Sequence, residues 1–121
     1  MTACCIGLMS GTSLDGVDAV LVDFSGDGLR VLGHQHRPFD ATLAAELLAL
    51  NTPGVNELHR AALAANALVR VYADAVDALL RASSTTASEV QAIGAHGQTV
   101  RHRPREFDGI GYTVQLNNPA L

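Results

Sequence analysis

Short apolar runs separated by polar breaks fill the chain up to Pro38, a pattern that predicts strands. Residues 3–9 are almost wholly apolar, which predicts a strand buried on both faces. Residues 17–24 are rich in valine, and residues 29–37 alternate between apolar and polar positions, which predicts two more strands. Residues 26–28, Gly-Asp-Gly, form a tight-turn sequence. We therefore expect three antiparallel strands joined by turns, with no helix between them.

Beyond Pro38 the apolar positions recur every three or four residues, which predicts two helices. Asp40 is a suitable N-cap for a short helix that ends near Leu50. A longer helix is expected over residues 56–82, with two oppositely charged pairs, Arg70–Asp74 and Asp77–Arg81, on its solvent side. One apolar stripe along this helix comprises Leu58, Ala61, Ala65, Leu68, Tyr72, Val76 and Leu79.

The last third of the chain reads mainly as strands. Thr86 followed by Glu89 is a capping-box pattern for a single helical turn. Residues 90–95 and 112–116 predict strands, whereas residues 101–106 are basic and contain a proline, which predicts a loop or an edge strand. Three antiparallel strands followed by helices and further strands give an α/β order. It resembles the ribonuclease H-like fold of the actin, hexokinase and Hsp70 group of ATPases.

Composition narrows the classes of function. The 121 residues suffice for one domain, and 48% hydrophobic with 17% charged residues excludes a disordered chain. The net charge of −4 argues against a nucleic-acid partner. All 8 cationic side chains other than histidine are arginines, so the chain has neither a P-loop lysine nor the strand lysine of protein kinases.

The two cysteines and the lengths of the apolar runs indicate where in the cell the protein is expected. Cys4 and Cys5 have neither disulfide-framework nor metal-site spacing, and we interpret them as strand residues. No apolar run approaches the roughly 18 residues that cross a bilayer, and the N-terminus lacks the basic start of a signal peptide. We expect a cytoplasmic protein without membrane contact.

The polar break at residues 11–16, Gly-Thr-Ser-Leu-Asp-Gly, is the first candidate site. Its glycines would let the backbone approach a phosphate, and Thr12 and Ser13 add hydroxyl donors. Asp15 suits Mg²⁺ or its bound waters beside phosphates. Because no helix is expected to follow, a helix N-terminus would not hold the phosphate. The same residue types are common in turns, so an ordinary hairpin loop is the alternative.

The second candidate site is residues 96–99, His-Gly-Gln-Thr, expected as a turn at a strand end, where α/β sheets place ligand groups. A single histidine there is more often structural than a base, so we interpret His96 as a residue that lines the site. His102 lies among three arginines, in either a solvated edge or an anion-binding rim. The other histidines, His34, His36 and His59, show no metal-ligand spacing and are expected at the surface.

Both candidate segments resemble signature segments of the anhydro-N-acetylmuramic acid kinases: residues 7–18, GLMSGTSLDGVD, and residues 93–104, IGAHGQTVRHRP. They occur in the family's order with comparable spacing, and the resemblance covers the whole chain. Members of the family use ATP and water to open the 1,6-anhydro ring of a sugar released in peptidoglycan recycling, and they form N-acetylmuramic acid 6-phosphate. The resemblance implies such an ATP-dependent transferase, a small sugar substrate and a homodimer for the full-length enzyme.

The resemblance also assigns residues. It implies that Arg101 pairs with the lactyl carboxylate of the sugar, and that Asp15 also binds the Mg²⁺ ion. The residues implied for the sugar site are His96, Gly97, Gln98, Thr99 and Arg101. Those implied for ATP are Gly11, Thr12, Ser13, Leu14, Asp15, Gly16, Val17 and Asp18. The alternatives are another small-molecule kinase of the same superfamily and a nucleotide-binding module without catalysis.

Members of this family are two-lobed and longer than this chain, and their general-base aspartate lies in a later segment. We therefore expect residues 1–121 to be an incomplete N-terminal lobe, with the second lobe absent and no catalytic base to assign. Asn117-Asn118 stands where members commonly have Gly-Asp. On its own, the chain is expected to show no phosphoryl transfer.

Overall fold

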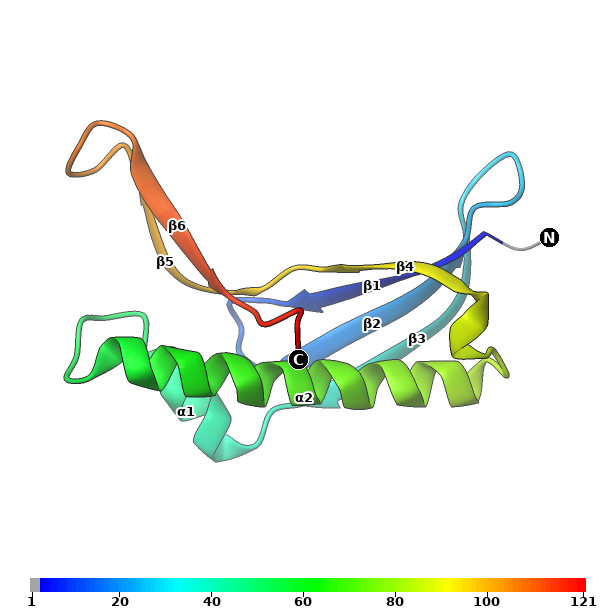
Figure 1. Cartoon of the computed structure of the whole chain (residues 1–121), viewed down its shortest axis with the longest axis horizontal. Coiled ribbons are helices and arrows are strands. Elements are labelled where there is room, and N and C mark those ends of the chain that lie inside the picture. The colour runs from blue at the N-terminus through cyan, green and yellow to red at the C-terminus, as the bar shows by residue number, and fades with distance from the viewer. Residues whose placement is uncertain (1–2) are drawn as a thin grey trace.

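Four strands form a mixed sheet in the structure, a computed structural model that describes residues 3–121 (Figure 1). β1 (Cys4–Ser10), β2 (Gly16–Asp23) and β3 (Arg30–Pro38) are successive strands, and each is antiparallel to its neighbour, as predicted. β4 (Val90–Ala95) pairs with β1 in parallel, so the strand order is β3-β2-β1-β4. The predicted α/β class and the three antiparallel strands are confirmed.

Two helices follow the antiparallel strands, near the predicted boundaries. α1 (Ala41–Ala49) begins after Asp40, whose side chain accepts a hydrogen bond from the Leu43 backbone N–H at 2.7 Å, so the predicted N-cap is confirmed. α2 (Glu57–Ala82) lies along one face of the sheet (Figure 1), with Leu68 and Leu79 fully buried in the core. No helix within residues 3–121 is both long and apolar enough to span a bilayer.

A short 3₁₀ helix, η1 (Ala87–Glu89), leads from α2 into β4. The Glu89 carboxylate accepts hydrogen bonds from the Thr86 backbone N–H at 2.7 Å and from the Thr86 hydroxyl at 2.8 Å. The predicted capping box is therefore confirmed. These bonds also lower the pKa of Glu89, with the backbone N–H of Thr86 as the largest cause.

β1 differs from the prediction in its burial. Cys4, Ile6 and Leu8 are buried on the side of α2, but Met9 is 46% exposed. Within residues 3–121 a helix covers only one face of the sheet, so β1 is buried on alternate residues rather than on both faces.

α2 also departs from prediction at its surface. Leu58, at the start of the expected apolar stripe, is 88% exposed because the first turn of α2 extends past the sheet. The two charged pairs on α2 lie on its solvent side as predicted, since all four side chains are exposed, and neither pair is among the ion pairs that residues 3–121 form.

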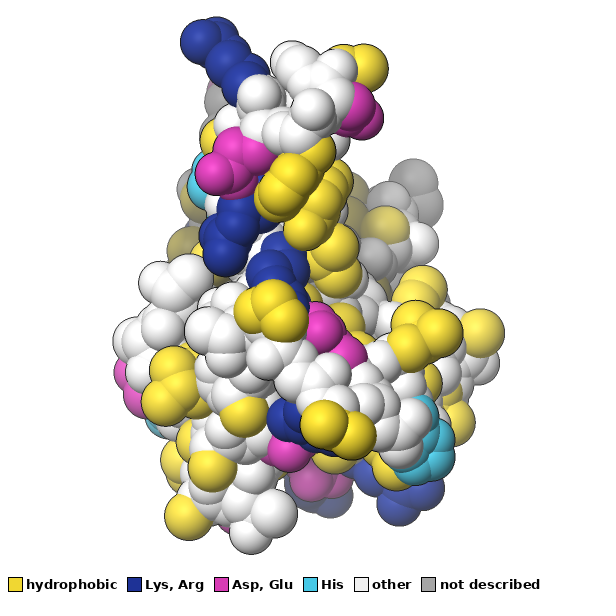
Figure 2. All heavy atoms as spheres, turned by 90° about the vertical axis from the view of Figure 1, so that its left-hand side faces the viewer, with side chains coloured by type: hydrophobic (Ala, Val, Ile, Leu, Met, Phe, Trp, Pro, Cys, Tyr) yellow, Lys and Arg dark blue, Asp and Glu magenta, His cyan; other side chains and the backbone are white. Residues whose placement is uncertain are grey.

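β5 (Gln98–Pro104) and β6 (Gly111–Leu116) form a separate two-stranded antiparallel sheet that rises from one end of the body (Figure 1). The basic segment predicted as a loop or an edge strand is thus largely strand, and Gln98 and Thr99 begin that strand rather than forming a turn. Figure 2 shows hydrophobic side chains gathered along this hairpin. Phe107, 82% exposed, stacks on Tyr112 there with ring centroids 6.0 Å apart.

Candidate functional site

The two candidate segments meet at the carboxyl ends of β1 and β4. Because these strands are parallel, with Leu8 opposite Ala95, the residues that follow them lie at the same edge of the sheet. Across this edge the Ser10 hydroxyl donates a hydrogen bond to the Gln98 side-chain oxygen, and both residues are 1% exposed. A contact between positions 88 residues apart thus joins the two segments into one site.

The glycine loop between β1 and β2 presents polar groups to solvent. The side chains of Thr12, Ser13 and Asp15 are exposed, and the Ser13 hydroxyl donates to Asp15 Oδ1 at 3.1 Å. The Leu14 backbone N–H closes a turn by donating to the Gly11 carbonyl at 3.3 Å, with φ of Leu14 at 57°. As predicted, a strand rather than a helix follows the loop.

The two glycines of the loop have different roles. A Cβ added to Gly11 would come no closer than 3.9 Å, to Ser13 Oγ, so the backbone there is open to an approaching phosphate. A Cβ added to Gly16 would lie 2.2 Å from the Arg37 carbonyl oxygen, and its φ is +149°. Gly16 is therefore needed where β2 meets the end of β3, which corrects the expectation that both glycines serve the phosphate.

Val17 and Asp18, at the end of the implied ATP-binding stretch, point away from the loop. Val17 is fully buried in the core. Asp18 lies on the opposite face, where its Oδ1 is 3.1 Å from His34 Nε2 and 3.1 Å from His36 Nδ1. The hydrogen bond with His36 is the largest cause of the lowered pKa of Asp18. The part of the stretch that lies in the loop is thus residues 11–15.

His96 is exposed, and both of its ring nitrogens have polar partners. Nδ1 lies 2.8 Å from the Gly97 carbonyl oxygen, which can only accept, so Nδ1 donates this hydrogen bond. Nε2 lies 3.1 Å from the side-chain nitrogen of Gln115. The same amide donates to Thr99 Oγ1 at 3.3 Å. The Gln115 amide therefore links the His96 ring to the Thr99 hydroxyl.

Two contacts hold the backbone of this segment in place. The Tyr72 hydroxyl on α2 donates to the His96 carbonyl. A Cβ added to Gly97 would lie 2.5 Å from the Leu116 carbonyl oxygen. β6 can approach this closely only because Gly97 has no side chain. The roles of Tyr72 and Gln115 were not predicted from the sequence. A tyrosine within a buried stripe was the available signal, since its hydroxyl needs a partner.

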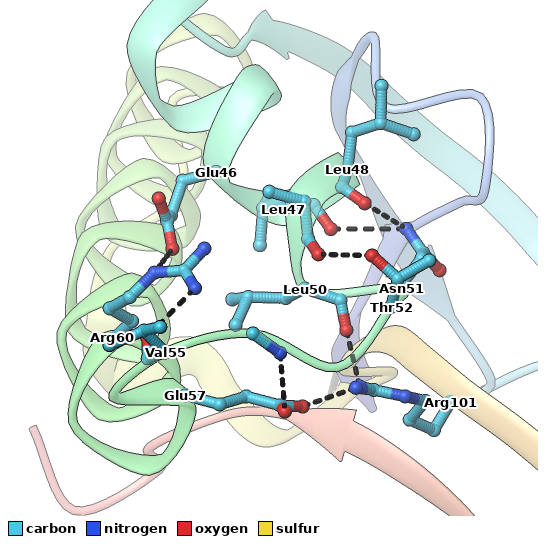
Figure 3. A network of polar contacts seen from close by, with 12 residues as sticks. Glu46, Leu47, Leu48, Leu50, Asn51, Thr52, Val55, Glu57, Arg60 and Arg101 are labelled. Atoms are coloured by element: carbon cyan, nitrogen blue, oxygen red, sulfur yellow. Dashed lines mark hydrogen bonds and ion pairs between the residues drawn. The ribbon is translucent and has the colours of Figure 1, made fainter.

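Arg101 is turned into the protein (Figure 3). It is 9% exposed, and its guanidinium donates to the Leu50 carbonyl and to Glu57 Oε1, each at 2.5 Å. Beside it, Arg60 pairs with Glu46 at 2.7 Å (Figure 3). Arg101 therefore anchors β5 to the junction of α1 and α2, and this geometry does not support its expected pairing with a substrate carboxylate.

Exposed hydroxyls, an open backbone at Gly11 and the carboxylate of Asp15 suit a phosphate group with a hydrated cation. Within the described part of the chain, no three His, Cys, Asp or Glu side chains are arranged to hold a metal ion. A cation at Asp15 would thus take its other ligands from water and phosphate oxygens.

Comparison with known proteins identifies the family of this chain. The family model described as anhydro-N-acetylmuramic acid kinase matches residues 3–121. Curated relatives with that name are 71% identical in Albidiferax ferrireducens and 66% identical in Variovorax paradoxus, each over 116 residues. Each alignment covers 96% of this chain but only 30% and 31% of the relative, respectively, so the chain spans about a third of their length. The chain belongs to the anhydro-N-acetylmuramic acid kinase family.

Proposed function

We propose that this chain contributes the phosphate loop and part of the sugar site to a kinase that converts 1,6-anhydro-N-acetylmuramic acid, with ATP and water, to N-acetylmuramic acid 6-phosphate. Family membership supports this substrate. The observation that carries the proposal is the meeting of residues 11–15 and 96–99 at one sheet edge, joined by the bond between Ser10 and Gln98. A kinase needs its phosphate donor and its acceptor side by side.

In the proposed reaction the bond between C1 and O6 of the sugar breaks, and water supplies the new hydroxyl at C1. O6 receives the γ-phosphoryl group, and ADP and one proton are released. Mg²⁺ bound with ATP would neutralise charge on the phosphates. Gly11, Thr12 and Ser13 would donate hydrogen bonds to phosphate oxygens, and Asp15 would hold the ion through its carboxylate or bound water.

His96 and Thr99 are the residues proposed to contact the sugar. A sugar hydroxyl would take the place of the Gln115 amide, which contacts both the exposed His96 ring and the Thr99 hydroxyl. Gly97 and Gln98 are buried and would shape the site without touching the sugar.

Other expectations from the resemblance become parts of this proposal. We propose that the chain forms one lobe of a two-lobed, ribonuclease H-like kinase, supported by its mixed sheet and by the greater length of its relatives. Cytoplasmic localisation follows from the need for ATP. The homodimer stays a prediction, to be tested by the mass of the intact enzyme in solution.

The test is a chimera in which residues 3–121 replace the matching segment of the Albidiferax ferrireducens kinase. The purified chimera is incubated with ATP, Mg²⁺ and 1,6-anhydro-N-acetylmuramic acid, and ADP and the 6-phosphate are measured by mass spectrometry. We expect equal amounts of the two products. An identical reaction with 1,6-anhydro-N-acetylglucosamine, which lacks the lactyl group, should be much slower.

Two results would contradict the proposal. A folded chimera that hydrolyses ATP without phosphorylating the sugar would favour a different acceptor. A folded chimera that binds ATP without any turnover would favour the nucleotide-binding module.

A further inference from the structure

The segment that carries His96 is held firmly by its neighbours. The His96 backbone N–H donates to the Leu8 carbonyl of β1 at 2.9 Å, and the His96 carbonyl accepts from the Tyr72 hydroxyl on α2. Gln98 pairs with Leu116 in the ladder between β5 and β6. Three different elements therefore fix this part of the backbone.

The glycine loop is held at its two ends and by Leu14, a partly buried residue that packs against the core. At its far end the Asp15 carbonyl accepts from the Phe39 backbone N–H at 3.3 Å. At its near end stands Ser10, the last residue of β1, whose hydroxyl donates to Gln98. Since residues 11–13 and 15 are partly or fully exposed, the position of the loop depends on these few contacts.

The Gln98 side chain is buried, and both of its polar atoms are hydrogen-bonded within the protein. Its oxygen accepts from Ser10, its nitrogen donates to the Thr99 carbonyl at 3.3 Å, and the residue is 1% exposed. A sugar cannot reach this amide while the bond to Ser10 is intact. An influence of Gln98 on the reaction must therefore be exerted through Ser10.

We propose that Gln98 is a positioning residue, which fixes the phosphate loop relative to His96 and Thr99 through its bond to Ser10. This inference rests on the proposed function, in which the loop holds ATP and residues 96 and 99 hold the sugar. Transfer between two bound molecules requires their reacting atoms to be aligned, and a misplacement of about 1 Å can cost up to roughly 100-fold in rate. The bond links the sugar segment, which three elements hold, to a loop that has fewer contacts.

The test compares Ser10→Ala, Gln98→Met and the double variant in the chimera, with kcat and KM measured for ATP and for the sugar. Each single variant should lower kcat by about 10-fold or more, and KM for the sugar should change by less than about 3-fold. Both changes break the same bond, so their effects on kcat should not multiply. The kcat of the double variant should lie within about 3-fold of that of the slower single variant. Ser10→Thr, which keeps the hydroxyl, should retain most of the activity.

Gln91→Met is the matched control, since Gln91 is exposed on β4 and the change is chemically the same. It should leave kcat unchanged. Circular dichroism and thermal unfolding identify any variant that fails to fold, and hydrogen exchange of residues 10–16 measures loop mobility without requiring activity. Both Ser10→Ala and Gln98→Met should increase exchange there.

The outcomes separate this inference from the proposed function. If Gln98→Met raises KM for the sugar while Ser10→Ala has no effect, Gln98 is a sugar ligand and the inference is wrong. Independent effects that multiply in the double variant would also contradict it. If the unmodified chimera does not phosphorylate the sugar, the proposed function fails, and unchanged loop exchange in both variants would then overturn the positioning role as well.

Discussion

The Tyr72 hydroxyl donates a hydrogen bond to the His96 carbonyl, so the middle of α2 supports the backbone of the candidate sugar site. Tyr72 is 4% exposed, and removal of its hydroxyl would leave a carbonyl at the sheet edge without this partner. We expect Tyr72→Phe to lower the free energy of unfolding by about 1–3 kcal/mol. Urea unfolding measures this. Tyr112→Phe is the control, because Tyr112 is 46% exposed, and it should have little effect.

Because Tyr72 is buried, the free energy of unfolding should depend on pH in the alkaline range. Desolvation raises the pKa of Tyr72 from 10.0 to about 12 in the folded chain. Between these values the unfolded chain binds fewer protons than the folded chain, so the free energy of unfolding falls as pH rises. The contribution is fully present below pH 10 and is lost as pH passes 12. Guanidinium unfolding at several pH values should show a steeper loss for the wild type than for Tyr72→Phe; equal slopes would contradict this assignment.

Substitution of Gly16 should affect the stability of the fold, whereas substitution of Gly11 should affect nucleotide binding. Gly16→Ala places a methyl group against the Arg37 carbonyl at a positive φ, so we expect it to destabilise the fold by about 1–3 kcal/mol. Gly11→Ala meets open space and should change stability by less than about 0.5 kcal/mol. In the chimera, Gly11→Ala should instead weaken binding of a non-hydrolysable ATP analogue, measured by calorimetry. A stable Gly16→Ala variant would show that the strands can separate there at little cost.

Much of this fold could be predicted because its signals are local. The valine content of β2, the alternation in β3, the Asp40 cap and the box formed by Thr86 and Glu89 depend on residues close in sequence. The parallel pairing of β1 with β4 has no such local signal, and it alone brings residues 11–15 next to residues 96–99.

Individual side-chain roles were harder to predict for the same reason. Arg101 lies within a basic segment, yet it is buried because Glu57, 44 positions earlier, reaches its guanidinium. The same kind of distant contact buries Gln98. A motif identifies the segments that form the site. Only the packed structure separates residues that face a ligand from buried residues that support the ligand-facing ones.

Asp15 should be essential if it holds the cation beside the phosphates. Asp15→Asn in the chimera keeps the size of the side chain but removes its charge, and we expect turnover to fall by about 100-fold or more. Titration of activity with Mg²⁺ should show that the variant needs a higher concentration. Asp27→Asn, in the exposed turn between β2 and β3, is the control. Wild-type turnover and metal dependence in Asp15→Asn would exclude this role.

The proposed function requires the two segments at the carboxyl ends of β1 and β4 to bind the two substrates. Hydrogen exchange of the chimera tests it most directly, with a non-hydrolysable ATP analogue, with 1,6-anhydro-N-acetylmuramic acid, and with both. We expect the nucleotide to slow exchange at residues 10–16 and the sugar to slow exchange at residues 96–100, with the strongest protection when both are bound. Protection confined to other parts of this chain, or none in an active chimera, would contradict the claim.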